Sequence, residues 1–180
     1  QIACTRSFGR PITELSGLIE AISEFASRAA EKLRRQSGLA SQLLVFAHTS
    51  PFRPGPRFSQ SVVVPLRWPT ADSRLIVQSA VAGVSQIYQP GYRLSKAGVM
   101  LMDLTHGVAE QAELDLESGE VRDRTKLMMV MDALNSRYGR GTVHVGSASR
   151  PRVPGEWFMR QERLTPQYTT KWSDIPIARA

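Results

Sequence analysis

Apolar side chains between residues 15 and 33 recur at intervals of three and four positions, the spacing that places them on one face of a helix. Basic residues gather at the end of this stretch, where the helix dipole favours positive charge, and Gly38 is a natural stop. The pattern therefore predicts a helix that ends near Arg35. Its apolar face consists of Leu15, Leu18, Ile19, Ile22, Phe25, Ala26, Ala29, Ala30 and Leu33.

Shorter apolar runs lie on both sides of this helix and predict strands. Between two of them, residues 50–57 contain Pro51, Pro54 and Pro56, which exclude both a helix and a sheet interior. The two strands are therefore expected to form a hairpin. A second helix is expected to begin near Thr70, a candidate N-cap. The strands are expected at residues 1–9, 41–49, 58–65 and 92–104.

The predicted order of elements over residues 1–105 is β-α-β-β-α-β. This order is typical of an α+β domain of the split βαβ or ferredoxin-like kind, in which both helices cover one face of the sheet. Because crossovers are right-handed, few other arrangements are compatible with it. The second face of the sheet would remain free for a partner.

The composition changes after residue 105. Residues 106–120 contain five acidic side chains and no Lys or Arg, so residues 106–123 are expected to form an acidic linker. Residues 124–180 are expected to form a small helical and irregular tail. A segment of roughly 60 residues is marginal for independent folding, and we expect it to dock on another surface. Its elements are expected to be a helix at 124–138 and short strands at 142–145 and 157–159.

Composition limits the classes of function. The 180 residues include 23 Lys and Arg against 16 Asp and Glu, a net charge of +7 that favours a polyanionic partner such as nucleic acid. The single cysteine, Cys4, excludes an intramolecular disulfide and a zinc site built on several thiolates. No apolar run approaches the roughly 20 residues that cross a bilayer, and no membrane partner is expected. The chain starts inside a predicted strand without a Met, so we expect a piece of a longer intracellular protein.

Signals of catalysis are weak. His48, His106 and His144 are far apart and form no i, i+4 pair, so metal ligation is less favoured than an ordinary structural role. Gly139-Arg140-Gly141 follows a predicted helix and lacks a Walker lysine, which favours a helix cap over a phosphate loop. Asp103 is the one acid in the predicted strands, whereas a two-metal site needs several carboxylates. We expect no catalytic residue, metal or cofactor in this chain, and a binding module instead.

Basic residues are expected on strands and loops that border the uncovered face of the sheet. Such an array would neutralise phosphates and bind duplex DNA without sequence preference and with strong salt dependence. The alternative is that these are ordinary surface cations. Aromatic platforms at RNA-recognition positions are not evident, which weakens a single-stranded RNA interpretation. The predicted DNA-binding residues are Arg6, Arg10, Arg53, Arg57, Arg67, Arg93 and Lys96.

A short linear motif lies inside the acidic linker. Gln111 is followed by Leu114 and Leu116, so an extended peptide could place the Gln in a polar notch and both leucines in an apolar groove. Six residues match such a pattern by chance quite often. A solvated tether therefore remains the alternative.

Two blocks of sequence are specific enough to be compared with known protein families. The opening block is CTRSFG at residues 4–9. The closing block is longer and more specific, and includes MDALN at 131–135, RYGRGT at 137–142 and LTPQYTT at 164–170. Together they resemble the UmuC family of Y-family translesion DNA polymerases. The resemblance implies that residues 1–105 are a little-finger domain and residues 124–180 a UmuC-type C-terminal tail.

The same resemblance implies a non-catalytic role for this chain in error-prone, SOS-induced DNA repair. The family's little finger binds the primer–template duplex across the major groove. The palm, with its catalytic carboxylates and Mg²⁺, would precede Gln1, so the chain should be inactive alone. A bacterial cytoplasmic location at the nucleoid is expected.

Protein partners are also implied by the resemblance. Family members bind the sliding clamp through a peptide just after the little finger, and Gln111, Leu114 and Leu116 match that peptide in type and position. Glu117 departs from it, because an aromatic residue often stands there. The tail is associated in the family with a UmuD′-type subunit and the RecA filament.

Two other hypotheses remain beside the DNA-binding piece of a polymerase. The chain could be a protein-interaction scaffold whose positive charge serves solubility, in which case it would bind protein partners but little DNA. It could also be a free-standing enzyme, which would require catalytic groups that the sequence does not offer.

Overall fold

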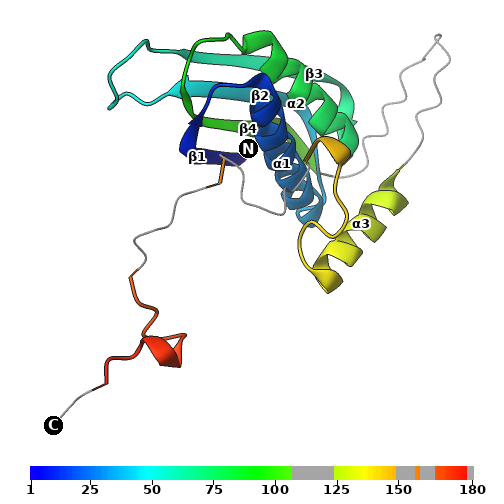
Figure 1. Cartoon of the computed structure of the whole chain (residues 1–180). Helices are drawn as coiled ribbons and strands as arrows, with labels where there is room; N and C mark the ends of the chain where they lie inside the picture. The colour runs from blue at the N-terminus through cyan, green and yellow to red at the C-terminus, as the bar shows by residue number, and fades with distance from the viewer. Residues whose placement is uncertain (107–123, 149–156, 159–164, 178–180) are drawn as a thin grey trace, which may run out of the picture.

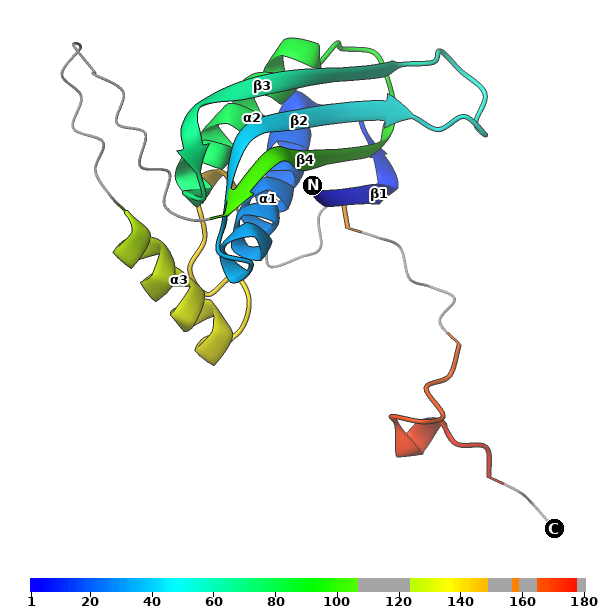
Figure 2. The ribbon, with the colours of Figure 1, turned by 180° about the vertical axis from the view of Figure 1, so that it is seen from behind.

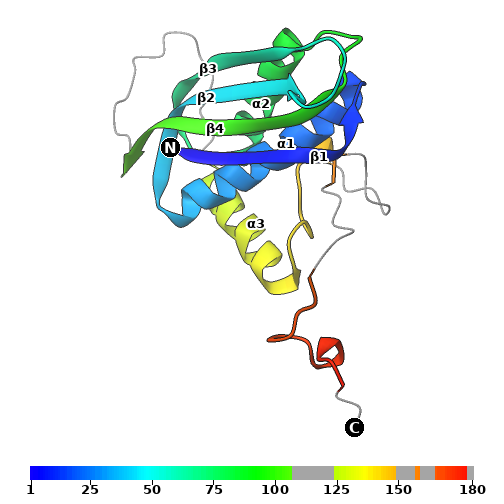
Figure 3. The ribbon, with the colours of Figure 1, turned by 90° about the vertical axis from the view of Figure 1, so that its left-hand side faces the viewer.

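The computed structural model describes residues 1–106, 124–148, 157–158 and 165–177. Four strands, β1 (Ile2–Ile12), β2 (Gly38–Thr49), β3 (Ser59–Thr70) and β4 (Leu94–His106), form one sheet in the order β1-β4-β2-β3. All neighbouring strands are antiparallel. Helices α1 (Leu15–Arg35) and α2 (Ser73–Ile87) both lie on one face of the sheet (Figures 1 and 3). The predicted α+β class and β-α-β-β-α-β order are confirmed.

Each helix connects two parallel strands that have one other strand between them. β4 lies between β1 and β2, and β2 lies between β3 and β4. This interleaving is the split βαβ arrangement, and it makes β2 and β4 the central strands.

The core lies between the sheet and the two helices. Leu18, Ile22 and Phe25 of α1 are fully buried, as are Leu43 of β2 and Leu101 of β4. The apolar side chains at spacings of three and four in α1 therefore face alternate residues of the central strands, as their periodicities require.

The outer strands are longer than the sequence predicts. β1 continues past Gly9 and Pro11, and β3 continues past Pro65 and Pro69. Both are edge strands, where a residue without an N–H group can face away from the neighbouring strand. Proline therefore does not end these two edge strands, although it ends the strands predicted from the sequence.

Helix α2 begins later than predicted. Its N-cap is Asp72, whose carboxylate accepts a hydrogen bond from the Arg74 backbone N–H at 2.8 Å. The predicted cap at Thr70 is wrong, because Thr70 is the last residue of β3 and its hydroxyl instead accepts from the Asp72 N–H. Two consecutive side-chain bonds therefore connect the strand to the helix.

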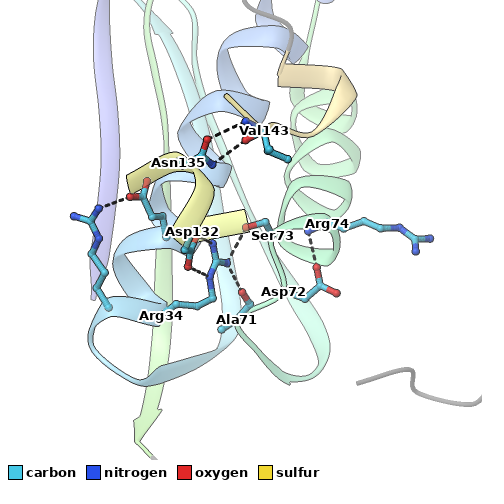
Figure 4. A network of polar contacts seen from close by, with 10 residues as sticks. Arg34, Ala71, Asp72, Ser73, Arg74, Asp132, Asn135 and Val143 are labelled. Atoms are coloured by element: carbon cyan, nitrogen blue, oxygen red, sulfur yellow. Dashed lines mark hydrogen bonds and ion pairs between the residues drawn. The ribbon is translucent and has the colours of Figure 1, made fainter. Parts of the chain in front are cut away.

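The tail contains helix α3 (Thr125–Tyr138) and two short 3-10 turns, η1 (Gly146–Ala148) and η2 (Trp172–Asp174). Arg34 of α1 binds Asp132 of α3 through two bonds of 2.7 Å, and it also donates to the Ala71 carbonyl and the Ser73 hydroxyl (Figure 4). The expected docking of the tail is confirmed for α3, and its surface is the helical side of the domain.

The short strands predicted in the tail are wrong for the described residues. The Asn135 side chain donates to the Val143 carbonyl and accepts from the Val143 N–H, both at 2.9 Å (Figure 4). The N–H and C=O groups of Val143 are therefore both satisfied by a side chain and not by a neighbouring strand. Trp157 and Phe158 are also not in a strand, although Gly9 donates a backbone hydrogen bond to Phe158. Met159 lies outside the described residues.

None of the described helices is both long and apolar enough to cross a membrane.

Candidate nucleic-acid interface

The face of the sheet opposite α1 and α2, hereafter the open face, is identified by the alternation of side chains along β2. Val45 and Ala47 are buried against the helices, so Phe46 and His48 point to the open face. The register places Lys96 beside His48, and therefore on the same face. Figure 3 looks onto this face, with the helices behind the strands.

The described parts of the tail leave the open face uncovered. Helix α3 is bound through Arg34, and η1 contacts α1, so both lie on the helical side. The segment around η2 lies away from the sheet (Figures 1 and 2). The free face expected from the sequence is therefore present in the part of the chain that the structure describes.

Five of the predicted DNA-binding residues lie at one end of the sheet, hereafter the hairpin end. The β2–β3 loop carries Arg53 and Arg57, and it extends beyond the rest of the sheet (Figures 1 and 2). Lys96 pairs with both Ser7 and His48, close to this loop. Arg93 directly precedes β4, and Arg10 lies where β1 reaches the start of β4. Strands from three parts of the chain thus bring these cations together.

The segments that form the hairpin end carry no acidic residue. Residues 7–12, 50–58 and 88–96 contain neither Asp nor Glu. Arg10, Arg53, Arg57 and Arg93 are exposed, and Lys96 is half-buried. No acid from these segments offsets their charges, which favours a positive potential suited to a polyanion.

Arg67 and Arg6 are placed elsewhere. Arg67 points to the open face, as do the exposed Val63 and Pro65 at alternate positions of β3. It lies at the opposite end of β3 from the hairpin loop. Its guanidinium is 4.8 Å from the centroid of the Trp68 ring. Arg6 pairs with Ala97, which is fully buried against the helices. The expectation that Arg6 borders the open face is therefore wrong, because its position along β1 directs it to the helical side.

Aromatic side chains form a feature of the open face that the sequence analysis missed. The rings of Phe46 and His48 are 6.1 Å apart between centroids, with an interplanar angle of 14°. Phe52, in the hairpin loop, is 93% exposed. The sequence pattern that indicates this feature is the alternation at the end of β2, where small or branched apolar residues occupy one face and aromatic rings occupy the other.

The predicted clamp-binding residues Gln111, Leu114 and Leu116 lie outside the described residues, as does most of the predicted linker.

A small cavity between α1 and α3 offers no alternative site of nucleotide size. Its volume is about 50 Å³, and its lining includes Arg34 and Asp132, which bind each other, and Arg28, which binds Glu24. Within the described residues, no group of three or more His, Cys, Asp or Glu side chains is arranged to hold a metal ion. The Arg34–Asp132 pair of this cavity serves the docking of α3, and the Arg28–Glu24 pair lies within α1.

Comparisons with known proteins give relatives that match nearly the whole chain. Protein ImpB of Salmonella typhimurium is 42% identical over 181 residues, which cover 99% of this chain and 42% of ImpB. Protein UmuC of Salmonella typhimurium strain LT2 is 38% identical over 97% of this chain and 41% of UmuC. Protein MucB of Escherichia coli is 34% identical over 99% of this chain and 41% of MucB. The chain thus spans about two fifths of the length of these relatives.

Family models divide the match into two regions. A domain of unknown function (DUF4113) matches residues 125–178. The model described as the impB/mucB/samB family C-terminal domain matches residues 1–116, which include all four strands and both helices of the sheet domain. The chain therefore belongs to the impB/mucB/samB family.

Proposed function

We propose that this chain is the DNA-gripping and partner-docking part of an error-prone translesion DNA polymerase that acts in SOS repair. Membership in a family that includes UmuC supports this proposal. The catalytic carboxylates and their Mg²⁺ would belong to another part of the polymerase. The chain itself would bind the primer–template duplex in the bacterial cytoplasm, at the nucleoid.

The observation that carries the proposal is the group of cations at the hairpin end. Arg10, Arg53, Arg57, Arg93 and Lys96 come from segments that contain no acid, next to a face that no described tail segment covers. A protein that contacts phosphates through such residues binds DNA irrespective of sequence and releases counterions as it binds.

A charge-reversal experiment tests the proposal. Arg53→Glu, Arg57→Glu and Arg93→Glu are combined, and the affinity for a duplex is measured at several salt concentrations. We expect binding to weaken at least about tenfold, and the slope of log K against log salt to fall by about 2 to 3, since each phosphate contact contributes about 0.9.

The matched control reverses three exposed cations of the helical surface and α3. Arg35→Glu, Arg74→Glu and Lys126→Glu change the net charge by the same amount. If the control weakens duplex binding as much as the hairpin-end variant does, binding depends on net charge and the proposed interface is wrong.

A second candidate function, a protein-interaction scaffold, is favoured by the outer face of α3. Leu127 is 56% exposed, Val130 is 55% exposed and Tyr138 is 61% exposed, and all three lie on one side of the helix. Such a stripe suits a protein partner, and a UmuD′-type subunit or the RecA filament would be the candidates. In this case, the hairpin-end variant would keep its protein partners and the wild-type chain would bind little DNA.

The sliding clamp is a further proposed partner, through Gln111, Leu114 and Leu116. Replacing all three with Ala should abolish co-elution with the clamp and leave duplex binding unchanged. Clamp binding that survives this triple replacement would rule out the peptide.

A further inference from the structure

Two aromatic rings stand next to each other on the open face of the central strand β2. Phe46 and His48 are two positions apart, so their side chains emerge on the same face about 7 Å apart along the strand. Their ring planes are nearly parallel, at 14°. The His48 Nδ1 lies 3.0 Å from the Thr49 carbonyl, which can only accept, so this nitrogen carries the proton and the contact fixes the ring. The pair is thus held in a defined orientation.

Three register neighbours of the two rings have short side chains, whereas Lys96, on the β4 side of His48, has a long one. In the register, Gly98 and Ser61 lie beside Phe46, and Ser59 lies beside His48 on the β3 side. None of these three has a side chain long enough to cover a neighbouring ring. Phe46 and His48 are half-buried, so part of each residue is accessible from the open face.

A third ring follows in the loop that leaves β2. Phe52 is 93% exposed, and its backbone N–H donates to the Ser50 hydroxyl at 3.3 Å. Pro51 and Pro54 lie within two positions of it and restrict the backbone, which lowers the entropy lost when the loop is immobilised. The Phe52 ring is therefore accessible to a partner and contributes little to packing.

Cations lie beside these aromatic residues. Lys96 is the register partner of His48, and Arg53 directly follows Phe52. Arg57 belongs to the same loop. Proteins that bind a single strand on a sheet combine two components. Aromatic rings stack with the bases, and neighbouring cations bind the phosphates.

We propose that the open face binds single-stranded DNA, with unpaired bases stacked on Phe46, His48 and Phe52 and phosphates bound by Lys96 and Arg53. This site shares Lys96 and Arg53 with the duplex contacts proposed above, but it also requires that bases stack on the three rings, and a paired duplex does not expose its base faces along its sides. The choice of DNA over RNA rests on the proposed function. A polymerase fragment with this site would hold a displaced or unpaired segment of the template.

The test compares two fluorescein-labelled probes of equal phosphate number, oligo(dT) and a hairpin duplex, on the full 180-residue chain. Phe46→Leu, His48→Leu and Phe52→Leu remove the rings and keep apolar bulk. We expect each replacement to weaken oligo(dT) binding about tenfold, the cost of losing one stacked base, with less than a twofold change for the duplex. Trp172→Leu is the control, since Trp172 is an 89% exposed ring in the η2 segment, which lies away from the sheet (Figure 1).

The outcomes separate this inference from the proposed function. Oligo(dT) binding that is unchanged in all three variants, or that falls together with duplex binding, overturns the single-strand site. Tighter binding of oligo(U) RNA than of the DNA probe overturns the choice of DNA. A wild-type chain that binds oligo(dT) but no duplex contradicts the duplex proposal and supports this one. If Phe46→Leu unfolds the chain, Phe52→Leu still tests the single-strand site, because the Phe52 ring makes no contribution to the core.

Discussion

Cys4 is a single thiol whose surroundings determine its reactivity. It lies on the helical side of β1, and burial raises the pKa of its thiol, although the nearby charges of Lys32, Arg28 and Arg6 act in the opposite direction. The thiolate is the nucleophile, so a raised pKa lowers the reactive fraction near pH 8. We expect iodoacetamide to alkylate Cys4 more slowly in the folded chain than in urea, with a rate profile that inflects at higher pH. The alkylation rate is measured by mass spectrometry. Equal rates in the folded chain and in urea would contradict the buried environment.

Gly98 is a second position where the neighbouring residue determines the effect of a substitution on stability. A Cβ atom there would lie 2.5 Å from the Cγ2 of Thr5 and 2.9 Å from the Thr5 Cα, which belongs to the backbone. Because the backbone cannot easily move away, Gly98→Ala should lower the free energy of unfolding by about 1–3 kcal/mol. Urea denaturation measures this. Gly146→Ala, where a Cβ meets nothing within 4 Å, is the control and should change stability by less than about 0.5 kcal/mol. Similar losses in both variants would exclude the contact with Thr5 as the cause.

At the scale of elements, the sequence predicts helices well where periodicity is strong and strand ends poorly where tertiary position matters. Helix α1 is found within its predicted limits because its apolar positions repeat over five turns. The ends of β1 and β3 are missed because Pro11 and Pro65 are tolerated only if the strand is at an edge, and strand order is not visible in the sequence. The wrong strand at 142–145 has a similar origin, since the partner of Val143 is the side chain of Asn135.

The candidate interface is predictable in composition but not in arrangement. The sequence identifies Arg53 and Arg57 as loop residues, and their exposure is confirmed. It does not show that Lys96 lies beside His48, because the register between β2 and β4 joins residues 48 positions apart. Nor does it show the side on which Arg6 emerges, since a shift of one residue would reverse it.

The attachment of α3 to the sheet domain depends on Arg34. Its guanidinium donates two bonds to Asp132 and one each to Ala71 and Ser73, and only 13% of the side chain is exposed. Arg34→Ala should therefore lower the free energy of unfolding by about 2–3 kcal/mol and increase hydrogen exchange in α3, because charge-assisted bonds are lost and Asp132 is left without this partner.

The neighbouring Arg35 provides the control for this prediction. Its side chain is 59% exposed and pairs with Glu31 of the same helix, so Arg35→Ala should cost less than about 0.5 kcal/mol. If Arg34→Ala is as mild as Arg35→Ala, the two-bond pair contributes little and α3 is held by other contacts.

At the scale of the whole molecule, one face of the sheet is used for packing and the other remains accessible. The helical face receives α1, α2, α3 and η1, and Trp157 adds a ring from the tail to the core of the sheet domain. The open face keeps its rings and the hairpin-end cations accessible. A tail that docks on the helical side can therefore stabilise the domain and still leave the proposed DNA surface free.

This arrangement makes the stability of the sheet domain depend on a residue of the tail. Trp157 is 2% exposed and packs edge-on against Phe25 of α1, with 6.0 Å between the ring centroids. Trp157→Ala should lower the free energy of unfolding by about 3–5 kcal/mol, the usual cost of removing a large aromatic from a core, and Trp157→Phe should recover part of it. Trp172→Ala removes an 89% exposed ring of the same tail and should leave stability nearly unchanged. Urea denaturation followed by circular dichroism compares the three variants. If Trp157→Ala unfolds with the midpoint of the wild-type chain, the tail does not contribute to the core, and the sheet domain is stable without it.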